Sequence, residues 1–284
     1  MNPAWMPYRA GLSRGWAEFK HAVVSPTDII GTLSPSAIAI VVMVFLNDVV
    51  IDGAPLSLSS MMLPSLLGMN IAFGGLMGVV GQLATEREDG TLLRNKAIPG
   101  GMTGYLVGIV VSITGTTIIS LILVLIPGML LFDGIGFDGA GTVLMFILVT
   151  LVGLIATMPI GAVLGSLFAS ARQIGLLMLP IMGLVAISGI FYPITALPQW
   201  LQWIGQVFPF YWLGLGMRST LLPGEMAAVE IGESWRHWET FGVLGLWAVV
   251  GLLLAPIVLR RMAQRESGSA VAARREKAMN SPIG

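Results

Sequence analysis

The chain has 284 residues, of which 55% are hydrophobic and only 11% are charged. Because soluble domains carry about 25% charged residues, this composition excludes an ordinary soluble protein and predicts that lipid surrounds the fold. The formal net charge is zero, which argues against a nucleic-acid partner. The absence of cysteine excludes disulfides and thiolate sites, and two histidines far apart make a histidine metal site unlikely to form.

The first 27 residues form a cytoplasmic segment without an uninterrupted apolar stretch, so we predict no signal peptide there. Residues 4–24 place Leu12, Trp16 and Phe19 near one another on a helical wheel, with charged residues elsewhere on it. This pattern predicts an amphipathic helix that lies in the cytoplasmic interface of a membrane. A disordered basic leader is the alternative.

A membrane-spanning helix needs about 20 mostly apolar residues. Six such segments define a transmembrane domain over residues 28–259, and they lie at 28–47, 60–83, 102–131, 142–168, 173–191 and 239–259. In the third segment, Pro127 and Gly128 predict a break or a bend. The sequence therefore predicts an all-α membrane protein with six transmembrane helices.

The distribution of lysine and arginine predicts the orientation of these helices. All but two of the 15 basic residues fall in the N-terminal segment, the 84–101 loop, the 169–172 turn or the tail 260–284. Only Arg218 and Arg236 lie on the opposite side. We therefore expect both termini to be cytoplasmic, with a basic cytoplasmic tail.

The cytoplasmic loop 85–98 is the place where energy from a partner would enter. Thr85 and Glu88 form a capping-box pattern, which predicts that a short helix begins at Thr85. Leu92 and Leu93 offer an apolar contact to a partner, whereas Gly90 weakens the helix or bends it. A simple solvated loop of the positive-inside type is the alternative.

Residues 192–212 are too apolar for a free loop, yet three prolines forbid one continuous spanning helix. We predict a broken, partly re-entrant helical hairpin on the outer face. A plain aromatic anchor at the headgroup boundary is the alternative, because the segment is rich in tryptophan, tyrosine and phenylalanine.

The sequence lacks the chemistry of an enzyme or of an ion-coupled pump. No lysine directly follows a glycine, so there is no P-loop, and residues 134–139 match G-x-G-x-x-G only as a turn between two apolar segments. The interiors of the six segments carry almost no ionisable side chain, although proton- or sodium-coupled transport needs one. An enzyme or lipid-handling protein that uses Glu225, Glu233 or His237 without an ATPase is the alternative, and a structural or sensing protein is a third possibility.

At loop 85–98 the sequence Glu86-Arg-Glu-Asp-Gly90-Thr91-Leu92 resembles the E-x-x-x-G-T-L signature of ABC-2 type transporter permeases. The stretch Pro198-Gln-Trp200-Leu201, followed by Pro209-Phe-Tyr211, is similar to the region before the last helix of that family. The resemblance covers essentially the whole chain. Within the family, the drug-resistance branch, with exporters similar to those for daunorubicin, is closest in length.

The resemblance implies a permease subunit of an ATP-driven exporter in the bacterial cytoplasmic (inner) membrane, which moves a drug, a lipid or a lipid-linked molecule. The chain would bind no cofactor, because ATP and Mg would sit on two copies of a separate ATPase subunit. A second permease chain, as a homodimer or a heterodimer, would complete the substrate path.

The resemblance also assigns two sets of residues. The helix that couples the permease to the ATPase would contain Glu86, Arg87, Glu88, Gly90, Thr91 and Leu92. The outer gate and re-entrant region would contain Pro193, Pro198, Trp200, Pro209 and Tyr211.

Overall fold

The computed structural model describes residues 5–47, 56–98, 100–167 and 171–265, which fold almost entirely into helices and short turns. Within these residues six apolar helices make up the body of the protein: α2 (Pro26–Phe45), α3 (Leu58–Glu88), α5 (Gly101–Leu131), α6 (Ala140–Leu167), α7 (Ala171–Ile187) and α10 (His237–Arg265). Four of them, α3, α5, α6 and α10, are long and apolar enough to cross a membrane, and shorter apolar stretches occur at Ser34–Phe45 and Gly175–Ile187. The predicted all-α architecture of a membrane protein is therefore confirmed.

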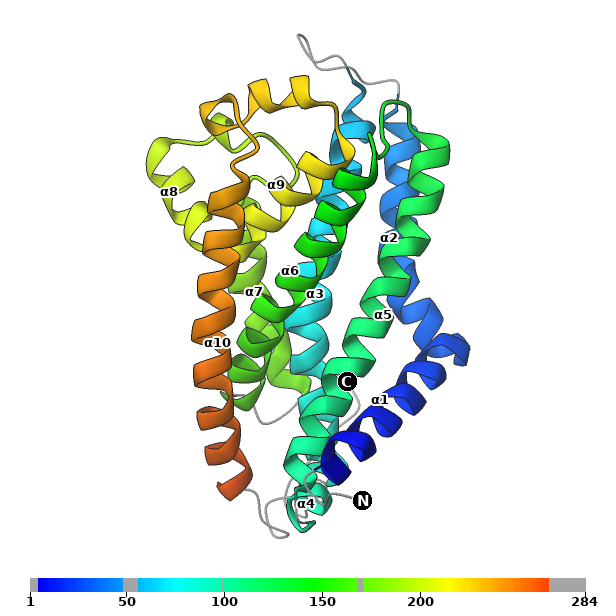
Figure 1. Ribbon diagram of the computed structural model, residues 1–284, viewed down its shortest axis with the longest axis vertical. Coiled ribbons are helices and arrows are strands. Elements are labelled where there is room, and N and C mark those ends of the chain that lie inside the picture. Colours follow the sequence, from blue (N-terminus) through cyan, green and yellow to red (C-terminus); the bar gives the residue numbers. More distant parts are fainter. Residues whose placement is uncertain (1–4, 48–55, 99, 168–170, 266–284) are drawn as a thin grey trace.

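Helix α3 is the centre of the bundle, and it packs against α5, α6 and α9 (Pro209–Leu221) (Figure 1). Leu63, Leu67 and Ile71 recur every four residues along one face of α3, and all three are 0% exposed. Helix α9 approaches closely at Gly68, where an added Cβ would lie 2.8 Å from the carbonyl of Leu213. Small residues allow such close contact between helices where water is absent.

Each of the six apolar helices contains a proline inside its length, although proline removes one helical hydrogen bond. These residues are Pro35, Pro64, Pro127, Pro159, Pro180 and Pro256. The predicted break at Pro127 does not occur, because α5 continues as one helix to Leu131.

Helix α1 (Met6–Val24) forms where the amphipathic helix was predicted, so the alternative of a disordered leader is wrong for these residues. It lies obliquely across the lower part of α5 in Figure 1. Gly11 and Gly15 of α1 meet Gly104 and Gly108 of α5 so closely that an added Cβ would lie 2.4 Å and 2.5 Å from the respective carbonyl oxygens.

At the end of the bundle drawn uppermost in Figure 1, the proline-rich segment folds as predicted into broken helices. They are η2 (Ile194–Ala196), α8 (Gln199–Val207) and α9 (Pro209–Leu221), followed by η3 (Gly224–Val229) and η4 (Ile231–Glu233). The second arm of the hairpin is longer than predicted, because α9 continues to Leu221. Helix α7 is also shorter than the predicted segment 173–191, since it ends at Ile187 and Gly189 turns the chain with φ +62°.

Candidate functional site

Loop 85–98 folds as a sharp corner between α3 and α4 (Thr91–Lys96), at the lower end of the bundle in Figure 1. The prediction that a helix begins at Thr85 is wrong. Helix α3 continues through Thr85 to Glu88, and the Asp89 N–H donates to the Thr85 carbonyl over 3.0 Å. The corner instead depends on Gly90, whose φ of +78° favours glycine, and on Asp89 Oδ1, which accepts from the Thr91 N–H over 2.8 Å.

Glu86 points into the protein and is only 7% exposed. Arg14 Nη2 of α1 donates to Glu86 Oε1 over 2.7 Å, and Gln82 Nε2 donates to the same oxygen over 2.9 Å. Arg14 Nε also donates to Glu18 Oε1 over 2.6 Å, and the guanidinium lies 5.2 Å from the centre of the Tyr105 ring. The carboxylate therefore attaches α1 to the last turn of α3.

Arg14 remains charged in this cluster. Burial alone would lower its pKa, but the hydrogen bond that Arg14 donates to Glu18 and the charges of Glu86 and Glu18 outweigh that effect and raise the pKa. The cluster thus contains one cation and two carboxylates beside the α3–α4 corner.

The other residues assigned to coupling are not equivalent. Leu92 is 1% exposed and packs in the core, so it lies beneath the surface of the corner. Leu93 beside it is partly exposed, and the apolar contact to a partner stays a prediction. Arg87, Glu88, Gly90 and Thr91 are partly exposed around the corner. The exposed surface near them comes from Asp89, Arg94, Lys96 and Ile98.

A cavity of about 440 Å³ and another of about 420 Å³ lie beside this corner. Both are lined by Arg14, Asn95 and Ile98, so they adjoin one another between α1 and α4. The second also contacts Glu18, Glu86, Asp89 and Arg94, and it is the more polar one. The sequence did not reveal this groove, because α1 and loop 85–98 are separated by more than 60 residues.

A third cavity, of about 650 Å³, lies between α2, α3 and α5. Its size is within the range of small-molecule sites. The lining is mostly apolar, including Phe73 and Met69, but Asn70 Nδ2 donates to Ser120 Oγ over 2.7 Å on its wall. Such a surface suits an amphipathic molecule with one or two hydrogen-bonding groups.

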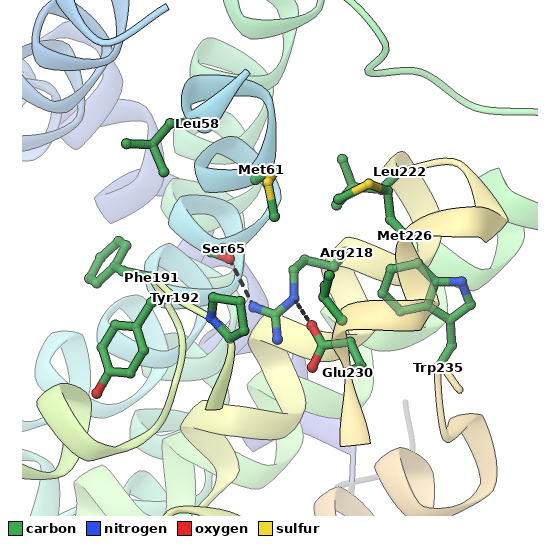
Figure 2. A pocket seen from close by; sticks show the side chains of 12 residues that line it. Leu58, Met61, Ser65, Phe191, Tyr192, Arg218, Leu222, Met226, Glu230 and Trp235 are labelled. Atoms are coloured by element: carbon green, nitrogen blue, oxygen red, sulfur yellow. Dashed lines mark hydrogen bonds and ion pairs between the residues drawn. The ribbon is translucent and has the colours of Figure 1, made fainter. Parts of the chain in front are cut away.

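The residues assigned to the outer gate do not gather in one place. Pro193 precedes η2, Pro198 precedes α8 and Pro209 is at the start of α9, so these prolines delimit the helices. Trp200 is 59% exposed, whereas Tyr211 is 0% exposed and packs edge-on against Trp212 with ring centres 4.9 Å apart. Pro193 lines the small cavity shown in Figure 2.

The pairing of charged groups at that small cavity was not predicted from the sequence. Arg218 Nε donates to Glu230 Oε1 over 2.7 Å, and Arg218 Nη1 donates to Ser65 Oγ over 2.9 Å (Figure 2). A cation in the otherwise apolar stretch 209–222 was the signal available in the sequence. Several acidic residues follow Arg218 in the chain, so the sequence does not identify which of them is its carboxylate partner.

Among the residues that the structure describes, no group of three or more histidine, aspartate or glutamate side chains could hold a metal ion. Glu225, Glu233 and His237, the residues of the enzyme alternative, are all exposed.

The family model of the ABC-2 family transporter proteins matches residues 32–257, which is well over half of the chain. No curated protein matches the sequence.

Proposed function

The chain belongs to the ABC-2 family of transporter proteins, and from this premise we propose that it is the transmembrane subunit of an exporter driven by a separate ATPase. The family makes the chain a multi-pass membrane component of an ABC transporter. Export, rather than import, and the place of the ATPase contact belong to the proposal. The observation that carries it is the family match together with the exposed, charged corner between α3 and α4.

The proposed topology has six crossings by α2, α3, α5, α6, α7 and α10, with α1 in the interface and both termini in the cytoplasm of a bacterium. The positions of the basic residues support this orientation. Arg94 and Lys96 lie in α4, and Arg260 and Arg261 lie at the same end of the bundle on α10. Cytoplasmic loops carry an excess of such residues.

Two ATPase subunits, which carry the ATP and Mg, would dock at the α3–α4 corner of two permease chains. We assign the docking contacts to the exposed residues Asp89, Arg94, Lys96 and Ile98. Glu86 and Leu92 are both buried, so they hold the corner in place from inside the protein. A second permease chain, identical or different, would face the open side of the 650 Å³ cavity.

The substrate we propose is a hydrophobic or amphipathic molecule such as a drug, a lipid or a lipid-linked compound, as in the drug-resistance branch. The cavity between α2, α3 and α5 supports this, because a mostly apolar wall with one amide and several hydroxyls suits a molecule of that kind. It is poorly suited to a strongly charged solute, which would need charged partners at that depth.

The test is affinity purification of the tagged chain from its native membrane, with the accompanying proteins identified and assayed for ATPase activity. We expect a P-loop subunit to co-purify with the wild-type chain and to be lost with Arg94→Glu plus Lys96→Glu. Glu225→Lys plus Glu233→Lys, charge reversals at the opposite end, are the matched control and should retain it. Recovery of the chain alone in several mild detergents would contradict the proposal.

A further inference from the structure

The cavity in Figure 2 contains an ion pair that joins four separate segments of the chain. Arg218 of α9 is 6% exposed, and Glu230, between η3 and η4, is 4% exposed. Arg218 reaches Glu230 over 2.7 Å, Ser65 of α3 over 2.9 Å and the carbonyl of Ile190, beyond α7, over 3.3 Å. One guanidinium therefore fastens the hairpin and the η3–η4 loop to the central helix.

These contacts cross the place where an exit at this end of the bundle would form. Helix α9 and the loop after α7 cover the end of α3, and Ser65 is buried beneath them. If the segments separate during transport, Arg218 has to release Ser65 or Glu230. The strength of this ion pair therefore contributes to the free energy needed to separate α9 from α3.

The surroundings of the ion pair favour reversible contact over maximal stability. Arg218 Nη2 and Glu230 Oε2 are buried, yet neither has a hydrogen-bond partner among the described residues. Arg218 and Glu230 both line a cavity of about 60 Å³, which exceeds the roughly 10–15 Å³ needed to hold a water molecule. Water in that space can hydrate both charges as they part, which lowers the penalty of separating a buried pair.

We propose that Ser65, Arg218 and Glu230 form a latch that holds the α8–α9 hairpin closed over α3 until transport opens it. This inference rests on the transporter function proposed above. Arg218 is a positioning residue in this scheme, because it acts on the hairpin and not on the substrate.

The chain contains no cysteine, so a single introduced thiol reports opening without interference. Met61 lines the cavity and is the reporter site, as Met61→Cys. Labelling by a hydrophilic maleimide is followed in permeabilised native membranes without ATP. We expect Ser65→Ala and Glu230→Gln each to accelerate labelling about tenfold, as the loss of a hydrogen bond to a charged group implies. Tenfold corresponds to about 1.4 kcal/mol.

Two controls separate a latch from a general loosening of the fold. Glu225→Gln removes a neighbouring exposed carboxylate and should leave the labelling rate at the wild-type value. A second reporter, Ala156→Cys, lies in the core of α6 at 0% exposure. Equal acceleration at positions 61 and 156 would overturn the latch, and so would unchanged labelling at 61 in both variants.

If Glu230→Gln does not fold, Ser65→Ala still decides the matter, since it removes one hydroxyl and leaves no charge unpaired. Permeabilised membranes make this result independent of the orientation and of the ATPase. The same reporter in sealed membranes, with the reagent outside and with ATP supplied to the complex, tests the proposed export cycle separately. Labelling that depends on the latch residues but not on ATP would support the latch and count against that cycle.

Discussion

The contact between α1 and α5 gives the sharpest prediction, because it is made by backbone against backbone. Replacing Gly11 and Gly15 by alanine places each new Cβ 2.4–2.5 Å from a carbonyl oxygen of α5 and 2.8 Å from the Cβ of Val107 or Val111. None of these atoms is the flexible end of a side chain. The helices must therefore separate by about 1 Å, and a gap of that size forfeits up to roughly half of the dispersion energy across it.

The magnitude follows from two opposing effects. Overpacking costs about 1–3 kcal/mol per site, and alanine recovers up to about 1 kcal/mol through its helix propensity. Taking about 2 kcal/mol of overpacking and about 1 kcal/mol of recovery at each site, the double variant should weaken the α1–α5 contact by about 2 kcal/mol, which raises the population of detached α1 about 30-fold. Detachment also exposes Arg14 and breaks its bond to Glu86.

Trypsin measures this population, because α1 contains Arg9, Arg14 and Lys20. Cleavage of a segment that opens and closes rapidly tracks the equilibrium population of its open form. We expect the double variant in detergent to be cut within α1 about 30-fold faster than the wild type. Gly31→Ala is the control, since an added Cβ there meets nothing within 4 Å. Cleavage of the double variant at the wild-type rate would refute the reasoning.

Three further predictions concern the same functional elements. Gly90→Ala forces a residue with a Cβ into φ +78° at a cost of about 1–2 kcal/mol, so it should misplace α4 and lower ATPase stimulation in the assembled complex, while Gly81→Ala should not. Arg14→Met should lower stimulation in the same assay, because it leaves the Glu86 carboxylate buried without its cation, and normal stimulation would show that α1 is not coupled to the corner. Gly78→Leu places a side chain on the wall of the 650 Å³ cavity and should weaken binding of a hydrophobic fluorescent substrate, whereas Gly242→Leu, in open space on α10, should leave binding unchanged.

The sequence predicts the helices well and their contacts poorly. Long apolar runs such as 102–131 identify helices because a chain in lipid has to satisfy its backbone hydrogen bonds within each segment. The same patterns do not specify where a helix stops. Thr85 and Glu88 fit a capping box, but α3 was already helical at that point, and Gly90 sets the real end.

The site residues show the same limit. The signature around Glu86 lies at the corner as the sequence suggested, yet the direction in which each side chain points depends on α1, which packs there from the other end of the sequence. Arg218 and Ser65 are 153 residues apart, so no local pattern relates them. The sequence does not predict the pairings between distant segments, because only the packing of the helices determines them.

The internal prolines have a mechanical consequence. A proline has no N–H to donate to the carbonyl four residues earlier, so each apolar helix has one position at which it can bend without breaking a backbone hydrogen bond. In α10 this position lies between Leu252 and Pro256, and in α6 between Ile155 and Pro159. Because α6 and α10 pack against each other, the pair can flex there while both ends remain anchored. The bundle can therefore bend at these prolines, and it can change shape without any helix unwinding.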